Sequence, residues 1–183
     1  MVKPSEASAR TVLDLTLSRP PTLGNGRLIC IDGPSGSGKT TLAAQVVQLE
    51  PAARVVHVDD LLDGWDGLPG LTDQLRTLVM TLAEGRPAAY RRFDWIADRY
   101  AETVSVPPGP MLVLEGVGSW APSYAALVTT SVWLEAPAEV RLARVLTRDG
   151  AEIEPQIRAW SVAEQEHLAG TGARGHADVL FGT

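Results

Sequence analysis

Short apolar runs recur along the chain and alternate with longer segments in which apolar residues return every three or four positions. The runs are rich in β-branched residues and bounded by glycine, proline or polar residues, a pattern typical of buried strands. They lie at residues 27–32, 54–58, 111–115, 129–134 and 178–181. Helical periodicity is found at residues 42–49, 71–83, 137–146 and 156–168. This alternation predicts an α/β fold with a five-stranded parallel sheet that helices cover on both faces.

Three other segments are less regular. Residues 1–24 hold a short periodic apolar patch that ends before Pro20, which predicts a leading helix and then a linker. Residues 59–70 and 148–155 are predicted to be loops, and the aromatic and charged segment 88–108 shows no clear period. We therefore divide the chain into an N-terminal helix and linker, residues 1–24, and a single domain, residues 25–183.

The composition narrows the class of protein. A chain of 183 residues with 45% hydrophobic and 21% charged residues is typical of one globular domain. Cys30 has no second cysteine to pair with, no apolar run approaches the roughly 20 residues of a membrane span, and no secretory signal is visible. We therefore expect a cytoplasmic protein without a membrane partner. The net charge of −6 argues against nucleic acid as a partner but is compatible with a local anion site.

A glycine-rich segment lies between the first predicted strand and the next predicted helix. Residues 33–40 match the pattern G-x-x-x-x-G-K-[ST]. Glycines allow backbone N–H groups to turn towards phosphate oxygens, and the N-terminus of the helix adds positive charge. Lys39 can bridge the β- and γ-phosphates, and the Thr40 hydroxyl can bind Mg²⁺. We predict that ATP binds with Mg²⁺ to Gly33, Pro34, Ser35, Gly36, Ser37, Gly38, Lys39, Thr40 and Thr41.

The sequence lacks the motifs that mark other classes of nucleotide-binding protein. The Asn-Lys-x-Asp base reader of GTPases cannot occur, because Asn25 is the only asparagine and Lys39 the only lysine after Lys3. The sequence also contains no Asp-x-x-Gly and no Leu-Ser-Gly-Gly-Gln. A compact phosphotransferase remains.

Acidic residues follow two of the predicted strands. Asp59 and Asp60 come after the second strand, and Glu115 ends the third. The carboxyl ends of parallel strands meet at one edge of a sheet, so these acids should face the glycine-rich segment. We assign Asp59 as the catalytic base, with Asp60 as the alternative, and assign Thr40, Asp59 and Glu115 to the metal site.

Arginines recur on the helix predicted after the fourth strand. Arg141, Arg144 and Arg148 share one helical face. Arginine can stabilise the charge that develops on a transferring phosphoryl group. We assign Arg144 and Arg148 as catalytic and place Arg141 on a solvated face.

Aromatic and charged side chains interleave in the middle of the chain, a mixture that suits stacking and hydrogen bonding to a planar ligand, although aromatics are as often part of the core. His57, His167 and His176 lack metal-ligand spacing and receive no role. The predicted acceptor site comprises Asp60, Trp65, Tyr90, Arg92, Phe93, Asp94, Trp95, Asp98, Arg99 and Glu115.

Together these motifs resemble the P-loop small-molecule kinases of the uridine kinase-like group, which includes phosphoribulokinase. The stretch "IDGPSGSGKTT" is similar to their phosphate loop, "VDDLL" to the segment with their catalytic aspartate, and "LEG" to the end of their third strand. The stretch "RLARVLTRD" is similar to their lid helix, "FDW" to the motif that holds the nucleoside, and "ADVLF" to a segment near the adenine. The resemblance implies a P-loop NTPase fold, a three-layer α/β/α structure with a short arginine-bearing lid.

The resemblance further implies an ATP- and Mg²⁺-dependent kinase that phosphorylates a hydroxyl of a small metabolite, as a monomer or homodimer. Two departures concern the acceptor: Asp60 replaces a serine, and Asp98 stands where the group has a base-reading histidine. We therefore expect uridine to be a poor substrate. The alternatives are a nucleoside monophosphate kinase, with Arg91, Arg92 and Arg99 as candidates to hold the substrate phosphate, and a non-catalytic nucleotide-dependent regulatory protein.

Overall fold

A parallel sheet of five strands forms the centre of the protein. The computed structural model describes residues 5–183, so the first four residues of the predicted N-terminal segment lie outside the described part. The strand order is β2-β5-β1-β6-β7, which confirms the predicted sheet. The strands are β1 (Arg27–Asp32), β2 (Ala53–His57), β5 (Met111–Glu115), β6 (Thr130–Glu135) and β7 (Val179–Gly182).

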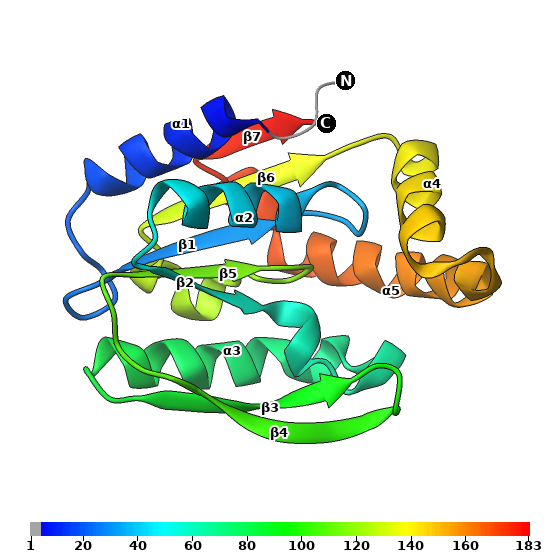
Figure 1. Cartoon of the computed structure of the whole chain (residues 1–183), viewed down its shortest axis with the longest axis horizontal. Helices are drawn as coiled ribbons and strands as arrows, with labels where there is room; N and C mark the ends of the chain where they lie inside the picture. The colour runs from blue at the N-terminus through cyan, green and yellow to red at the C-terminus, as the bar shows by residue number, and fades with distance from the viewer. Residues whose placement is uncertain (1–4) are drawn as a thin grey trace.

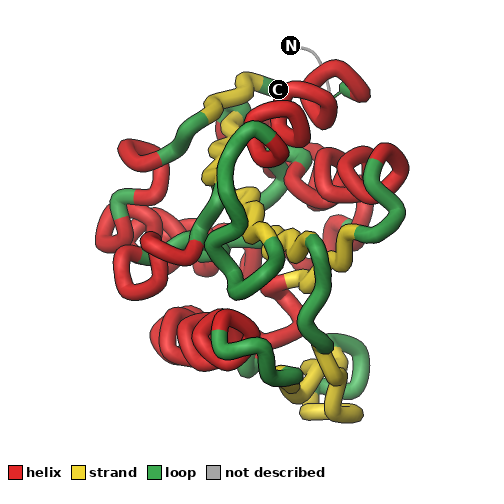
Figure 2. The backbone as a smooth tube through the Cα atoms, turned by 90° about the vertical axis from the view of Figure 1, so that its left-hand side faces the viewer, coloured by secondary structure: helices red, strands yellow, loops and turns green. Residues whose placement is uncertain are grey.

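Helices cover both faces of this sheet, as Figure 1 shows. Side chains of a strand alternate between faces, so Ile29 and Ile31 of β1 pack in one buried cluster and Leu28 and Cys30 in the other. The first cluster includes residues of α1 and α2, and the second includes residues of α3 and α5. Viewed from the side, the strands lie between the helical layers (Figure 2). The helices are α1 (Glu6–Leu17), α2 (Lys39–Leu49), α3 (Leu68–Ala83), α4 (Ala138–Asp149) and α5 (Glu154–Thr171).

The N-terminal helix α1 shares the core of the domain. Ser5 caps it with a reciprocal hydrogen bond to Ser8, and the buried face of the helix packs on α2 and β6. After the helix, the Arg19 guanidinium donates to both carboxylate oxygens of Asp178 at 2.8 Å. This ion pair fixes Asp178, which belongs to the "ADVLF" stretch, at the amino-terminal end of β7.

The middle segment without a clear period forms an antiparallel hairpin of β3 (Ala88–Asp94) and β4 (Arg99–Val106). The hairpin stands apart from the main sheet (Figures 1 and 2) and has few buried side chains, among them Phe93 and Val106. With most side chains on both of its faces in contact with solvent, the segment carries no strict alternation that would predict strands.

Two predicted loops are shorter than expected. In the predicted loop 59–70, a 3₁₀ turn, Val58–Leu61, reaches into the first residues, a second, Gly64–Asp66, follows, and α3 begins at Leu68. The predicted loop 148–155 is reduced to residues 150–153, because α4 continues to Asp149 and α5 begins at Glu154. The early starts of α3 and α5 are compatible with the proline in the first turn of each helix, a position that proline favours.

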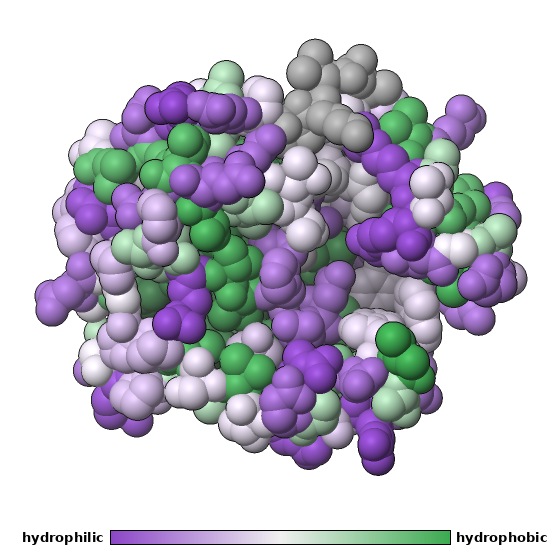
Figure 3. Space-filling view, viewed as in Figure 1, coloured by the Kyte–Doolittle hydropathy of each residue, from purple (hydrophilic) through white to green (hydrophobic). Residues whose placement is uncertain are grey.

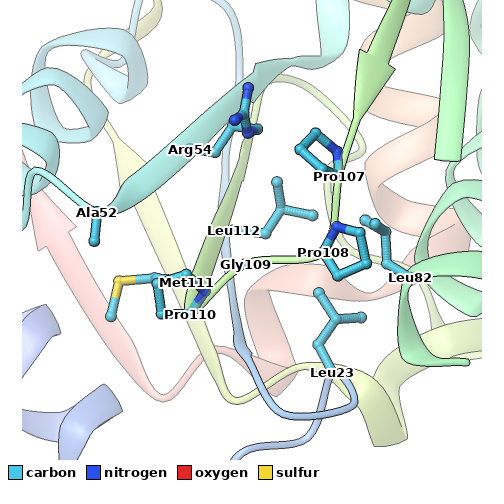
Figure 4. Close-up of a pocket in the computed structure, with 10 residues that line it drawn as sticks. All are labelled: Leu23, Ala52, Arg54, Leu82, Pro107, Pro108, Gly109, Pro110, Met111 and Leu112. Atoms are coloured by element: carbon cyan, nitrogen blue, oxygen red, sulfur yellow. The ribbon is translucent and has the colours of Figure 1, made fainter. Parts of the chain in front are cut away.

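A small hollow of about 180 Å³ lies at the amino-terminal ends of β2 and β5. Figure 4 shows Leu23, Leu82 and Leu112 around it beside Pro107 and Pro108, and Arg54 is its one charged lining residue. This hollow is at the opposite edge of the sheet from the glycine-rich segment, which follows the carboxyl end of β1. Within residues 5–183, no helix combines the length and the apolar character needed to cross a bilayer.

Candidate active site

A cleft of about 750 Å³ opens at the carboxyl-terminal ends of the strands, between α2 and α4. Figure 3 shows the surface hollowed there, with hydrophilic residues around the hollow. The structure brings together in its lining many of the residues singled out from the sequence: Ser35, Gly36, Gly38, Lys39, Thr40, Thr41, Asp59, Glu115, Arg144 and Arg148.

The glycine-rich loop, residues 33–38, joins β1 to α2 at the floor of this cleft. Gly33 has φ +138° and Gly36 has φ +76°, backbone conformations that favour glycine. A Cβ atom at Gly33 would lie 2.1 Å from the Leu134 carbonyl oxygen, and one at Gly36 would lie 2.5 Å from the Arg141 carbonyl oxygen. The loop can therefore take this close-packed curve only with glycine at both positions.

Lys39 is the first residue of α2, and its ammonium group is held inside the curve of the loop. Its Nζ donates to the carbonyl oxygens of Gly33 at 2.8 Å and of Pro34 at 3.0 Å, and the residue is only 7% exposed. A positive charge thus lies at the N-terminus of a helix, where backbone N–H groups also favour an anion.

Asp32, the last residue of β1, organises the loops around the cleft and was not singled out from the sequence. It is buried and accepts the backbone N–H of Gly33 at 2.7 Å and those of Gly118 and Trp120 at 3.0 Å. Burial raises its pKa to about 6, while these N–H groups and the Lys39 charge act in the opposite direction. The available sequence signal was an acid at the end of an apolar strand directly before the glycine-rich segment.

Glu115 lies between Thr40 and His57. The Thr40 hydroxyl lies 3.2 Å from Glu115 Oε1 and 3.3 Å from Oε2, and His57 Nδ1 lies 2.5 Å from Oε1. The hydrogen bond to Glu115 raises the pKa of His57, with burial acting in the opposite direction. His57 is therefore a second residue that the sequence analysis missed, since its contact with Glu115 arises from the pairing of β2 with β5.

Asp59 lies in the 3₁₀ turn after β2, and its side chain is exposed to the cleft. Protein encloses the floor of the cleft, and this enclosure raises the pKa of Asp59, whereas the Lys39 charge lowers it. The carbonyl oxygen of Asp59 accepts a hydrogen bond from Trp95 Nε1 at 3.1 Å, which ties the turn to the hairpin.

Asp60 is not among the residues that line the cleft. Its Oδ2 lies 3.5 Å from the Tyr90 hydroxyl, a long hydrogen bond to β3. Burial raises the pKa of Asp60, with the charges of His57 and Arg92 acting in the opposite direction. Burial and the neighbouring Asp60 raise the pKa of Tyr90 to about 12. The structure thus separates the two neighbouring aspartates, with Asp59 on the cleft.

The three arginines of α4 have different surroundings. Arg148 lines the cleft and pairs with Asp149 at 2.5 Å. Arg144 Nη1 donates to the Gly36 carbonyl oxygen and to Thr183 Oγ1, each at 3.1 Å. Arg141 does not lie on a solvated face as expected: its Nη1 donates to the Ser35 carbonyl oxygen at 3.1 Å. Arg141 and Arg144 therefore hold carbonyl oxygens of the glycine-rich loop, and Arg144, like Arg148, also lines the cleft.

The aromatic residues expected at the acceptor site form a cluster of edge-to-face contacts. Trp95 lies with its ring centroid 5.3 Å from that of Trp65 and 5.4 Å from that of Phe93, and Phe93 lies 5.5 Å from Tyr100. Phe93 is buried, whereas Trp65 and Trp95 remain 38% and 37% exposed. The two tryptophans can therefore contact a ligand, and Phe93 supports them.

The charged residues of the hairpin that have polar partners bind mostly to other residues of the hairpin. Arg92 pairs with Glu102 across the strands at 2.7 Å. Asp94 accepts the backbone N–H groups of Ile96 and Ala97 at 3.0 Å, and these bonds lower its pKa. Asp98, at φ +49°, and Arg99 are exposed around the hairpin turn. The structure brings neither these four residues nor the aromatic cluster into the lining of the cleft, where Glu115 alone of the predicted acceptor residues is found.

Comparison with curated proteins gives limited matches. No family model matches the chain. Two proteins of Arabidopsis thaliana, named inorganic pyrophosphatase TTM2 and TTM1, are 28% and 29% identical to it over 100 residues. The matches cover 49% of this chain but only 15% and 16% of those proteins, so the chain spans about a sixth of their length.

Solved structures show the fold. A possible uridine kinase from Bacillus stearothermophilus has a TM-score of 0.65 at 23% identity, covering 96% of this chain and 98% of its own. A candidate fructose transport system kinase from Silicibacter sp. TM1040 has a TM-score of 0.68 at 22% identity, with the same coverage of 96% and 98%. D-glycerate 3-kinase from Cryptococcus neoformans has a TM-score of 0.57 at 11% identity, covering 91% and 87%. The chain therefore has the fold of P-loop kinases, which confirms the resemblance at the level of fold.

Proposed function

We propose that the protein is an ATP- and Mg²⁺-dependent kinase that phosphorylates a hydroxyl group of a small metabolite. The observation that carries this proposal is that Lys39, Thr40, Asp59, Glu115 and Arg148 line one cleft. Phosphoryl transfer to a hydroxyl requires cations for the phosphates, oxygen ligands for a metal and a base for the hydroxyl proton, and these residues supply all three. The structural neighbours support the proposal, because uridine, fructose and D-glycerate, which appear in their names, all carry hydroxyl groups.

The glycine-rich loop fits the phosphates of a nucleotide. The close-packed curve at Gly33 and Gly36 leads the backbone into the N-terminus of α2, whose N–H groups and helix dipole favour phosphate oxygens. Lys39, already inside this curve, would neutralise charge on the β- and γ-phosphates. Thr41, in the first turn of α2, also lines the cleft.

The donor set beside the loop fits Mg²⁺. Thr40, Glu115 and Asp59 offer only oxygen atoms, which this hard cation prefers. Within residues 5–183 no group of three or more His, Cys, Asp and Glu side chains could hold a metal ion by itself, and Mg²⁺ characteristically takes most of its ligands from phosphate and water. When bound, the ion supplies charge neutralisation for the transferring phosphoryl group.

Asp59 would act as the base that accepts the proton of the acceptor hydroxyl. Its side chain faces the cleft, whereas Asp60 lies against Tyr90. A base is more effective when its pKa lies nearer the working pH, and enclosure moves the pKa of Asp59 in that direction. Trp95, bonded to the Asp59 carbonyl oxygen, would hold the turn in place.

The contacts of the hairpin favour a hydroxyl acceptor over a nucleoside monophosphate. A monophosphate kinase would need arginines directed at the substrate phosphate. Instead, Arg92 pairs with Glu102, and the Arg91 guanidinium lies 4.7 Å from the centre of the Tyr100 ring. The third candidate, Arg99, is exposed at the hairpin turn and does not line the cleft. The acceptor would then lie between Asp59 and the exposed faces of Trp65 and Trp95.

The test is an ADP-release screen with MgATP across nucleosides, nucleoside monophosphates, sugars and vitamin precursors. We expect turnover with at least one hydroxyl acceptor and loss of that turnover in Asp59→Asn. A protein that binds ATP, shows no acceptor-dependent ADP release, and keeps its nucleotide affinity in Asp59→Asn would support the non-catalytic alternative and overturn the proposal.

A further inference from the structure

A buried glutamate of α5 contacts the tip of the glycine-rich loop. Glu164 is 1% exposed and lies 129 residues after Ser35 in the sequence. Its Oε2 accepts the backbone N–H of Ser35 at 2.7 Å, and its Oε1 lies 3.4 Å from Arg141 Nη1. Leaving a buried carboxylate without partners costs free energy, so the Glu164 carboxylate favours the conformation in which the Ser35 N–H and Arg141 contact it.

Trp160, one turn earlier on α5, completes the contact. Its Nε1 donates to Ser35 Oγ at 3.0 Å and to Glu164 Oε2 at 3.2 Å. The opposite side of the contact is closed by Arg141, whose Nη1 also donates to the Ser35 carbonyl oxygen. The backbone N–H, the backbone carbonyl and the side chain of Ser35 are thus all bonded to residues of α4 and α5.

Trp160 also reaches the aromatic cluster. Its ring centroid lies 5.9 Å from that of Trp65 at an interplanar angle of 74°, and Trp65 in turn contacts Trp95. Trp160, which donates to Ser35 of the glycine-rich loop, is therefore packed against Trp65, one of the two tryptophans beside which we propose that the acceptor binds.

We propose that Glu164 and Trp160 are positioning residues that hold the first arm of the glycine-rich loop, Gly33 to Ser35, in the conformation that receives the γ-phosphate. The inference rests on the proposed function, since it assumes that the cleft binds ATP. Neither residue touches the reacting atoms; both act through Ser35.

The position of Lys39 indicates which part of the glycine-rich loop would lie next to the γ-phosphate. A P-loop lysine reaches the β- and γ-phosphates. The Lys39 ammonium lies against the carbonyl oxygens of Gly33 and Pro34, the two residues immediately before Ser35. The arm held by Glu164 therefore borders the γ-phosphate, whereas the amides at the start of α2 serve the phosphates that ATP and ADP share. Loosening the arm should weaken binding of a triphosphate more than binding of a diphosphate.

The experiment compares binding of MgADP with that of the non-hydrolysable analogue MgAMP-PNP, by calorimetry, to wild type, Glu164→Ala and Glu166→Ala. Glu166 is exposed on the same helix and gives a matched control for loss of a carboxylate. For Glu164→Ala we expect affinity for the triphosphate to fall about tenfold, the scale of one lost charged hydrogen bond, with the diphosphate within about twofold. Glu166→Ala should match wild type for both ligands.

Trp160→Phe keeps the ring packed beside Trp65 and removes the N–H that donates to Ser35. It should lower triphosphate affinity in the same selective way, and it keeps the inference testable if Glu164→Ala does not fold. An equal loss for both nucleotides, or no loss in either variant, would overturn the inference while leaving the proposed kinase intact. A wild-type protein that binds neither nucleotide would overturn the proposed function and the inference with it.

Discussion

His57 and Glu115 are direct neighbours in the pairing of β2 with β5, and their side chains meet with Nδ1 2.5 Å from Oε1 at the carboxyl edge of the sheet. Glu115 is 6% exposed at its side chain, whereas that of His57 is 49% exposed. The imidazole therefore provides the buried carboxylate with a partner on the solvent side, and Thr40 provides one on the side of the glycine-rich loop. The orientation of a proposed Mg²⁺ ligand thus depends on a residue to which the sequence assigned no role.

This pair predicts a pH dependence of stability. Because Glu115 raises the pKa of His57 above its ordinary value of 6.5, the pair stabilises the fold fully below the unfolded-state pKa and loses that contribution as pH rises through the folded-state pKa. The difference in unfolding free energy between wild type and His57→Gln should be largest below pH 6.5 and shrink towards pH 9. Urea unfolding at several pH values measures it, and a constant difference across this range would contradict the prediction.

Lys39→Ala should abolish most of the activity. Loss of the ammonium removes charge from the phosphate site, which should lower ATP turnover by roughly two or more decades. It also removes the bonds to the Gly33 and Pro34 carbonyl oxygens, so the melting temperature should fall. Arg158→Ala, which removes an exposed positive charge on α5, is the control and should keep turnover. Near wild-type turnover in Lys39→Ala would show that the loop does not bind the phosphates as proposed.

Asp59→Asn should keep ATP affinity and lower phosphoryl transfer by about a hundredfold or more, the scale of general-base catalysis. Asp60→Asn is the neighbouring comparison and should have the smaller effect, because Asp60 lies against Tyr90 rather than on the cleft. Steady-state rates and nucleotide affinity are measured for both variants. A larger loss of phosphoryl transfer in Asp60→Asn than in Asp59→Asn would show that Asp60, and not Asp59, is the base.

Arg148→Ala and Arg144→Ala should differ in kind. Arg148 lines the cleft, and its described hydrogen bonds go to Asp149 and not to the glycine-rich loop. Its loss should therefore lower the rate of phosphoryl transfer more than the affinity for ATP. Arg144 holds the Gly36 carbonyl oxygen, so its loss should lower affinity as well. Calorimetry and turnover separate the two effects. Equal losses of affinity and rate in Arg148→Ala would assign it a ground-state role.

Uridine and cytidine should be poor acceptors. Neither Asp98, which is exposed at the hairpin turn, nor Asp60, which lies against Tyr90, brings a hydrogen-bond donor to the cleft, and a pyrimidine carbonyl buried without a donor costs about 1–3 kcal/mol. Sugars and amino alcohols, which offer donors, should be better substrates. Steady-state assays decide the point: a kcat/KM near about 10⁵ M⁻¹s⁻¹ for either nucleoside, an ordinary enzyme value, would contradict the prediction.

The sequence by itself determined the layout of the domain and the phosphate-loop motif. Both depend on local information: the period of apolar residues separates strands from helices, and residues 33–40 are contiguous. Asp59 and Glu115 could be assigned to the same edge because each directly follows or ends a predicted strand, and parallel strands end together. The hairpin was missed because most of its side chains are solvated on both faces, which leaves no period to detect.

Only the tertiary structure decided which side chains meet around the cleft. His57 and Glu115 are 58 residues apart, and Ser35 and Glu164 are 129 apart, so no local pattern connects them. His57 meets Glu115 because β2 and β5 pair in one particular register, and Glu164 reaches Ser35 because α5 packs with α3 on one face of the sheet. A polar residue gains a defined role when burial removes water as its alternative partner, and burial is a property of the folded chain.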